Sequence, residues 1–446
     1  MAPEVQPLGV PRSDLAAATI GVERVPDRFR VLGFFDYFVL WADLGVGLLV
    51  LLAGTALVPG LGFWEAIAAI LIGTLIGNVM LGLAGVVGSD NGIPSMVSLR
   101  PSFGRRGSYL PSLINVVQLV GWGAFELVIM AQASGRLTQS LLGVSSYPLW
   151  TVFWGIVVTV FALGGPLVVV RQWLEKAGIW IVLVTGAWMV IYVVTHANFA
   201  ALAARHGDGS LSFAQGIDLV VAMPISWLPI VADFNRFAKT SRSSFWGTIS
   251  GFAVSNVLFY TLGVLLILVL PTGDLIGSIM TIAFGAAGLA LLLGDETDNA
   301  FADVYSGAIS IKNVLPGLST RALVTAIGGV CLAISLTVDL TSFQGFLYLV
   351  GSLFTPLFGI LFADYFVLKR RRYGTDDLYP TDGRGESRGW VNPVALLAWA
   401  CGIATYVAET TYVVGLGGTL PSLAASLIVY LVLSLGLERV RAVARA

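Results

Sequence analysis

Long runs of apolar residues recur along this sequence, and they constrain its fold more than any other feature. The runs are about 17 to 25 residues long, which is the length of α-helix that crosses the hydrocarbon core of a bilayer. Only 11% of the 446 residues are charged, whereas soluble domains carry about 25%. Outer-membrane barrels would instead show short segments of alternating polarity. We therefore predict an all-α polytopic membrane protein.

We expect about twelve membrane-spanning helices from these runs. Their approximate ranges are 33–58, 63–88, 109–140, 149–170, 177–195, 215–238, 246–270, 277–312, 322–338, 343–368, 391–412 and 420–437. Lysine and arginine gather in the loops that follow even-numbered spans, and odd-numbered spans are followed by almost none. This alternation fits the positive-inside rule, so we expect both termini to be cytoplasmic in a cell-membrane protein. The basic residues that define it include Arg100, Arg105, Arg106, Arg171, Lys176, Arg236, Lys239, Arg242, Lys312, Arg321, Lys369, Arg370, Arg371, Arg372, Arg439, Arg441 and Arg445.

The first and sixth spans are both interrupted by helix-breaking residues, and each opens a set of five spans. This is the pattern of a transporter built from inverted repeats, whose site lies at the broken helices. We therefore divide the chain into a cytoplasmic N-terminal segment (1–32), a first repeat (33–195), a second repeat (215–368), a cytoplasmic loop (369–390), two further helices (391–437) and a cytoplasmic tail (438–446).

The two interruptions differ in chemistry. Asp43, Gly45 and Gly47 lie inside the first span, where glycine permits an unwound backbone. The sixth span contains Pro224 and Pro229. Each proline removes a helical hydrogen bond, so we expect free carbonyls at Val220 and Ile225 that could bind a cation. The alternative for either span is a simple kink, because proline and glycine are common in membrane helices.

Acidic residues inside the spans outnumber the basic residues that could neutralise them. An acid at the bilayer centre costs about 2.5–3.5 kcal/mol on insertion scales and needs a partner. These acids must therefore bind protons, bind an external cation or face water, which is the argument for cation coupling. The alternative for the acidic run in the eighth span is a wetted loop. The acids are Asp43, Glu126, Asp295, Glu296, Asp298, Asp303 and Glu409.

Two groups of residues are candidates for binding. Asp295, Asp298 and Asn299 share one helical face and would offer oxygens to one point, as a hard cation such as Na⁺ requires. Trp122 and Glu126 lie one turn apart, so that they could stack on a flat heterocycle and accept its N–H donors. Alternatively, this tryptophan only packs and this glutamate is protonated or bonded to a neighbour. Ser226 and Trp227 could supply a second stacking or hydrogen-bonding element, and Asp43 and Asn299 complete the predicted substrate site.

Several classes of function are disfavoured. The net charge is −1, and no basic face suited to nucleic acid is evident. No metal-ligand spacing, hydrolase triad or Walker A lysine motif appears, so we expect neither an enzyme, nor a cofactor, nor an ATPase subunit. The expected partners are the lipid bilayer and a small molecule.

The chain also resembles the nucleobase:cation symporter-1 family, the purine/cytosine permeases. The resemblance is carried by Ile93-Pro94, Arg100-Pro101-Ser102-Phe103-Gly104, Gly121-Trp122, the segment Val231–Lys239, and Asp298-Asn299-Ala300 with Tyr305-Ser306. It implies a LeuT-like fold of two inverted five-helix repeats plus two C-terminal helices. It also implies a substrate between helices 1, 3, 6 and 8, and a cation, usually Na⁺, between helices 1 and 8.

The resemblance further implies individual roles. Trp122 becomes the stacking aromatic residue, and Glu126 stands where the family often has glutamine. Ser226 falls in the unwound stretch of helix 6. Ala42 and Gly45 fall near the cation-binding carbonyls, and Asp295, Asp298 and Asn299 fall near the ligands of helix 8. Many members have Asn, Ser and Thr in that stretch of helix 8, so the acids here leave H⁺ open as the coupling ion.

From these observations we predict a secondary active transporter. It would import a nucleobase or related small heterocycle, with cytosine-type pyrimidines favoured, by symport with Na⁺ in preference to H⁺. The alternatives are an uncoupled facilitator or channel, or a carrier of the same fold for an amino acid, a vitamin precursor or allantoin.

Overall fold

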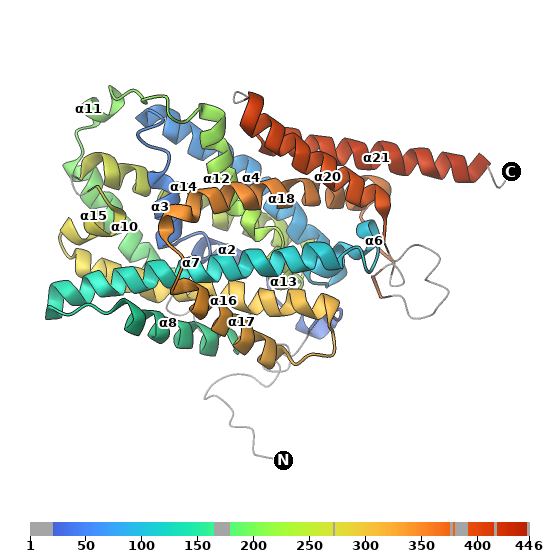
Figure 1. Cartoon of the computed structure of the whole chain (residues 1–446), viewed down its shortest axis with the longest axis horizontal. Helices are drawn as coiled ribbons and strands as arrows, with labels where there is room; N and C mark the ends of the chain where they lie inside the picture. The colour runs from blue at the N-terminus through green and yellow to red at the C-terminus, as the bar shows by residue number, and fades with distance from the viewer. Residues whose placement is uncertain are drawn as a thin grey trace, which may run out of the picture.

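The computed structural model describes residues 21–164, 179–270, 273–374, 378–379, 391–413 and 417–443. Arg12, Arg171, Lys176 and Arg445, and residues 375–377 and 380–390 of the predicted cytoplasmic loop, lie outside the described residues. Within the described part of the chain the regular structure is helical, and the β pairing consists of one isolated bridge between Leu32 and Ala238 (Figure 1).

Each predicted span overlaps a helix or a pair of helices. Among the described residues, six helices are long and apolar enough to cross a membrane, and a bent pair adds a seventh. The number of crossings remains a prediction, because several spans contain shorter apolar helices. The main helices are α2 (Phe34–Asp43), α3 (Leu48–Thr55), α4 (Phe63–Asn91), α7 (Tyr109–Leu142), α8 (Tyr147–Ala162), α10 (Ile179–His196), α12 (Phe213–Trp227), α13 (Val231–Asn235), α14 (Ser241–Val269), α16 (Gly285–Val314), α17 (Thr320–Ser335), α18 (Phe343–Phe362), α20 (Pro393–Ala408) and α21 (Thr419–Val443).

Short helices connect or extend these elements. They are η1 (Asp27–Phe29), α5 (Ser95–Ser98), α6 (Arg100–Phe103), α11 (Phe199–Ala203), α15 (Leu275–Thr281), η3 (Leu340–Ser342), the π-helical η4 (Ala363–Leu368) and the π-helical η6 (Glu409–Val413).

The first span is broken where the sequence predicts. Helix α2 ends at Asp43, α3 begins at Leu48, and the two are bent by 61°. The sixth span is also broken, but between α12 and α13, at residues 228–230. Pro224 does not open the helix as we expected, because it lies inside α12. The carbonyl of Ile225, which we expected to be free, accepts the Leu228 N–H at 3.0 Å.

Glycine allows the broken first span to lie close to its neighbour α14. A Cβ atom at Gly251 would lie 2.4 Å from the Phe38 carbonyl oxygen, and one at Gly263 would lie 2.2 Å from that of Leu51. Neither contact tolerates a side chain, so these glycines permit the close backbone approach that packs helices in membranes. The α14 scaffold therefore holds both halves of the broken helix.

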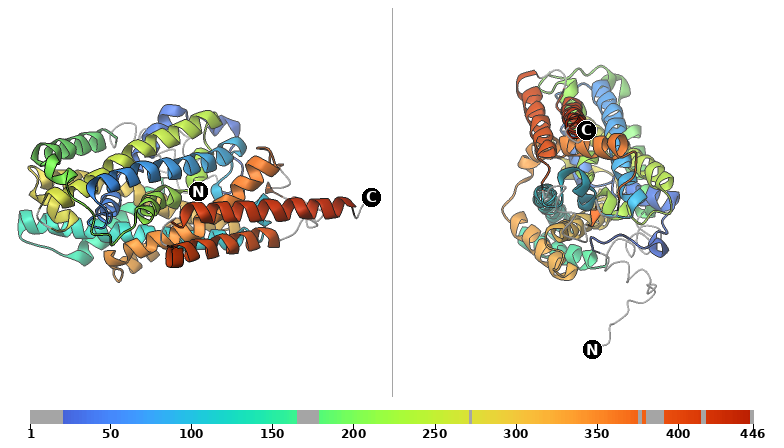
Figure 2. Two further views of the ribbon diagram at one scale, coloured as in Figure 1. Left: turned by 90° about the horizontal axis from the view of Figure 1, so that it is seen from above. Right: turned by 90° about the vertical axis from the view of Figure 1, so that its right-hand side faces the viewer.

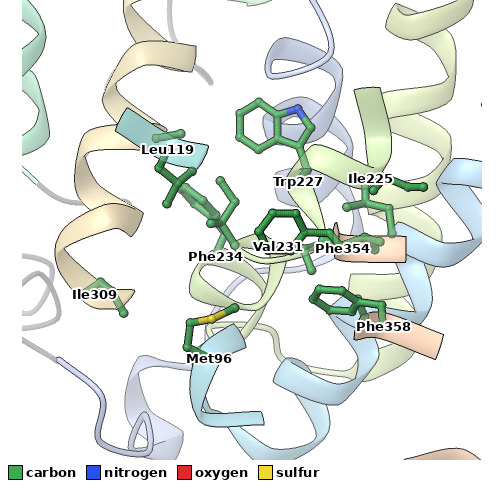
Figure 3. Close-up of a cluster of buried hydrophobic side chains, with 14 of the residues drawn as sticks. Met96, Leu119, Ile225, Trp227, Val231, Phe234, Ile309, Phe354 and Phe358 are labelled. Carbon is green, nitrogen blue, oxygen red and sulfur yellow. The ribbon is translucent and has the colours of Figure 1, made fainter. Parts of the chain in front are cut away.

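The second break is anchored by apolar packing. Trp227, Val231 and Phe234 lie on either side of it and pack with side chains from α5, α7, α16 and α18, as the close-up shows (Figure 3). These residues are almost fully buried. The unwound residues 228–230 are thus held between two segments that the core fixes in place.

Helix α16 packs along α7, and both are flanked by α8 and α17, while α4 packs against α12 and α14. The C-terminal helices α20 and α21 pack on each other and on α18, at one side of the bundle, and α21 extends beyond its neighbours (Figure 2). Asp218 of α12 fixes the start of α21, since its carboxylate accepts the Gly418 and Thr419 N–H groups at 2.6 and 3.1 Å.

Candidate functional site

The acidic run of the eighth span lies in the middle of α16, not in a wetted loop. Asp295, Glu296, Asp298 and Asp303 are at most 5% exposed. Because consecutive residues of a helix point in different directions, the run presents two neighbouring faces. One face carries Asp295 and Asp298, and the other carries Glu296 and Asp303.

The first face meets the end of α2. Oxygens of Asp43, Asp295 and Asp298 all lie within 4.8 Å of one another, and the three side chains are buried. We call these three residues the acidic triad. The oxygens of Asp43 and Asp295 have no hydrogen-bond partner among the described residues. The triad therefore gathers oxygen ligands of the kind that hard cations bind.

The second face of α16 holds the break of the first span. Glu296 accepts the Leu48 N–H at 2.7 Å, so its carboxylate caps the N-terminus of α3. Asn299 donates its amide N–H to the Val46 carbonyl at 2.7 Å. Between them lies Gly47, with φ of 157°, where a Cβ atom would meet Asn299 Nδ2 at 3.1 Å and Glu296 Oε1 at 3.2 Å. Only glycine lets the unwound backbone approach α16 so closely.

A pocket, which we call the cavity, lies beside this contact. The cavity is bounded by both breaks, by α7 and by α16. Its lining residues are Leu44, Gly47, Leu49, Val50, Trp122, Glu126, Met223, Ser226, Trp227, Ile230, Glu296, Asn299 and Asp303.

Two tryptophans contribute to the cavity wall. Trp122 packs edge-on against Phe343 and Phe346, with ring centroids 5.5 and 5.3 Å apart. Trp227 packs edge-on against Trp41 at 5.7 Å. The indole N–H of Trp122 has no acceptor among the described residues. The edge contacts hold both rings in place at the cavity wall, where such rings can contact a flat ligand.

The polar groups of the cavity are mostly acceptors. Glu126 and Glu296 both line the cavity, and each has one carboxyl oxygen with no hydrogen-bond partner among the described residues. Ser226, in contrast, donates its hydroxyl hydrogen to the Met223 carbonyl at 2.6 Å. The carbonyl of Ser226 accepts the Gln118 side-chain N–H at 2.9 Å. Among the described residues, no basic side chain forms an ion pair with Asp43, Glu126, Asp295, Glu296 or Asp303.

The structure brings most of the predicted site residues together, with a different division of roles. Trp122, Glu126, Ser226, Trp227 and Asn299 line one cavity. Asp43, which we predicted in the substrate site, lies in the acidic triad instead.

The predicted cation ligands are also rearranged. The Ala42 carbonyl accepts a hydrogen bond from the Ser255 hydroxyl, and Gly45 packs against the same serine. Asn299 directs its amide nitrogen to Val46 rather than to the triad.

Sequence reasoning did not place Glu296 and Asp303 in the site. Their spacing carried a signal, because residues 296, 299 and 303 follow the i, i+3, i+7 pattern of one helical face. Gln118 was also missed, and nothing in its sequence neighbourhood predicts that it bonds the carbonyl of Ser226.

Comparison with known proteins gives the family. Residues 24–432 match the family described as permeases for cytosine/purines, uracil, thiamine and allantoin. The chain belongs to this family. The resemblance to the nucleobase:cation symporter-1 family that the sequence motifs indicate is thereby confirmed.

Relatives in this permease family differ in their named substrates. A hydantoin permease of Microbacterium maritypicum is 23% identical over 87% of this chain and 84% of its own length. The cytosine permease of Escherichia coli (strain K12) is 29% identical over 79% of this chain and 80% of its own. An allantoin permease of Bacillus subtilis (strain 168) is 24% identical over 74% of each. Family members are permeases, which agrees with our prediction of a transporter rather than an enzyme.

Solved structures show the same fold. Mhp1, a nucleobase-cation-symport-1 family transporter, in a closed conformation with bromovinylhydantoin bound, matches with a TM-score of 0.80 at 22% identity over 94% of both chains. A Na⁺-coupled sialic acid symporter matches with a TM-score of 0.66 at 13% identity, again over 94% of both. The predicted LeuT-like fold is confirmed, and the protein is an integral membrane permease.

Proposed function

We propose that this permease imports a small planar heterocycle with several N–H donors, cytosine-type pyrimidines being favoured, by symport with a cation. Na⁺ is favoured over H⁺ as the coupling ion. The substrate would occupy the pocket lined by Trp122 and Trp227, and the cation would bind at the acidic triad. The proposal includes a cell-membrane location with both termini cytoplasmic, as the loop charges predict.

One observation carries the proposal: buried carboxylates lie at the break of the first span and in the pocket, and Asp43, Glu126, Asp295, Glu296 and Asp303 have no ion-pair partner among the described residues. Charged side chains this deep are expensive unless they are compensated. Asp43 and Asp295 have no hydrogen-bond partner among the described residues, and they lie beside Asp298. A cation that enters with the substrate would compensate them, which supports symport.

The preference for donor-rich rings rests on the cavity wall. Glu126 presents an oxygen with no partner among the described residues, and the Asn299 side-chain oxygen likewise has none. Cytosine offers an exocyclic amine to such acceptors, whereas uracil offers a carbonyl at the same place. A carbonyl facing a carboxylate leaves both groups unpaired at a cost of about 1–3 kcal/mol for each buried group.

Thermal-shift and uptake measurements test the proposal together. Purified protein would be screened against cytosine, uracil, hydantoin, allantoin and amino acids, in NaCl and in choline chloride. We expect a stabilising heterocycle whose effect is larger in NaCl and is lost in Trp122→Ala. Equal uptake in both salts would favour the uncoupled facilitator. Stabilisation by an amino acid alone would favour the other class of carrier.

A second variant tests the donor argument. We expect Glu126→Gln to lower the uptake of cytosine relative to uracil, because glutamine supplies an N–H that suits the uracil carbonyl. Unchanged relative uptake of the two bases would contradict this role of Glu126, while leaving the wider proposal intact.

A further inference from the structure

The hydrogen-bonding groups that remain available in the cavity are strongly unbalanced. The available acceptors are Glu126 Oε2, Glu296 Oε1 and Asn299 Oδ1, together with the Asp303 carboxylate. The available side-chain donors among the described lining residues are the indole N–H groups of Trp122 and Trp227. Other potential donors are already committed, since Ser226 bonds Met223 and the amide nitrogen of Asn299 bonds Val46.

The charge of the cavity is also unbalanced. Three carboxyl groups line it, those of Glu126, Glu296 and Asp303, and no Lys, Arg or His is among the described lining residues. A buried carboxyl group is compensated either by a proton or by a cation that binds beside it, and the described lining residues supply no cation. The Leu48 N–H at the N-terminus of α3 compensates part of the Glu296 carboxylate, whereas no hydrogen-bond donor of the described residues reaches Asp303.

The acidic triad does not remove this surplus. The triad is formed by Asp43, Asp295 and Asp298, and its cation would balance those carboxylates on the other face of α16. The cavity acids are a separate set, and the rest of the wall consists of two indole rings, Ser226, Asn299, Gly47 and apolar side chains. Faces of tryptophan attract cations as well as flat rings.

Building on the proposed function, we infer that the ring is bound and carried in a positively charged, protonated form, as an amino-substituted nitrogen heterocycle of amidinium type. Such a cation presents N–H donors along one edge, which matches the excess of acceptors. Its charge balances the Asp303 carboxylate, and its flat face suits Trp122 and Trp227. The ring enters as a cation from water and leaves as a cation into water, so the proton stays on the substrate and no protein group changes its bonding in the transfer.

A matched pair of rings tests the charge directly. At pH 7, 4-aminopyridine is a cation, and aniline is a neutral molecule of nearly the same shape. Each would compete with uptake of the heterocycle found by the screen, and each would be titrated into purified protein in a thermal-shift assay. We expect the cation to bind roughly ten- to hundredfold more tightly, the usual advantage of a charge-assisted contact with a buried partner.

Two variants identify the charge that is responsible. Asp303→Asn and Glu126→Gln remove one cavity carboxylate each, and we expect either to reduce the preference for 4-aminopyridine over aniline by about tenfold or more. Asp208→Asn is the matched control, because it removes a carboxylate from an exposed loop. If one cavity variant does not fold, the other still gives the ratio. A preference that survives both substitutions would overturn the inference.

The outcomes separate this inference from the proposed function. If neutral heterocycles bind and need Trp122, but aniline binds as well as 4-aminopyridine, the charge inference is wrong and the permease assignment of the cavity stands. If no ring of either kind stabilises the protein or competes for uptake, both are wrong.

Discussion

Neutralising one carboxylate of the acidic triad has an effect whose size can be worked from its dimensions. Oxygens of Asp43, Asp295 and Asp298 lie within 4.8 Å of one another. At an effective dielectric constant of about 20, two unit charges at that distance repel by about 3.5 kcal/mol. A sodium ion equidistant from three such oxygens would lie about 2.8 Å from each, and each attraction would be about 6 kcal/mol.

These values predict a large effect of a single substitution on Na⁺ affinity. The repulsions between the carboxylates are the same with and without Na⁺, so they cancel from the binding energy. Asp43→Asn therefore deletes one attraction of about 6 kcal/mol, which is partly offset because the amide oxygen remains a ligand. We expect the single variant to bind Na⁺ about a hundredfold or more weakly than the natural protein, and the double variant Asp43→Asn/Asp295→Asn to lose the Na⁺ response.

The assay is a Na⁺ titration of purified protein at pH 8, followed by thermal unfolding, with choline chloride holding the ionic strength constant. A second readout is the Na⁺ concentration that gives half-maximal uptake. In buffer without Na⁺, Asp43→Asn should unfold at a higher temperature than the natural protein, because it relieves repulsion. Asp208→Asn, which removes an exposed acid, is the control. An unchanged Na⁺ response in the single variant, or a response that persists in the double variant, would refute this reasoning.

Two other predictions follow from contacts of the described residues. Gly47→Ala should reduce uptake by about tenfold or more, since its methyl group would lie 3.1 Å from Asn299 Nδ2 at a strained φ costing about 1–3 kcal/mol; normal uptake at equal surface expression would contradict the close approach at the break. Arg371→Ala removes a two-pronged contact with Asp90, with N···O distances of 2.8 and 3.1 Å. Because Arg371 is half exposed, we expect its loss to cost at most about 1 kcal/mol in a thermal-unfolding assay, and a larger loss would show that this pair does more than a surface ion pair.

The break of the first span was predictable from sequence, because an acidic residue and glycines inside an apolar run disfavour a continuous membrane helix. Asp43 and Gly47, inside an apolar run, correctly predicted the break of the first span. The two prolines of the sixth span predicted a break, and it occurs at Pro229 but not at Pro224. Pro224 stays helical and packs so closely on Gly77 that a Cβ atom there would lie 2.2 Å from its ring. Which proline opens a helix depends on such tertiary contacts, and these are not visible in one sequence.

The candidate site was predictable as a set of residues but not as an arrangement. Trp122 and Glu126 could be recognised from their spacing on one helix. The sequence did not show which acids of α16 belong to the triad and which to the cavity. That division depends on how α16 is rotated relative to the break at Gly47. A shift of one residue would exchange Asp295 for Glu296. The sequence therefore indicated the chemistry of cation coupling while leaving open which carboxylate serves which ligand.

The arrangement suggests how the two ligands influence each other. The unwound residues between Asp43 and Leu48 end at the triad on one side and at the cavity on the other. Glu296 and Asn299 hold the backbone between these points by hydrogen bonds to Leu48 and Val46. A cation that draws Asp43 toward α16 would therefore stabilise the same two hydrogen bonds, which shape the cavity wall. By linkage, a ring that binds against Glu296 must then favour cation binding by an equal factor. Glu296→Gln keeps the side-chain shape and an acceptor for Leu48. It should thus weaken the mutual enhancement more than it weakens Na⁺ binding alone.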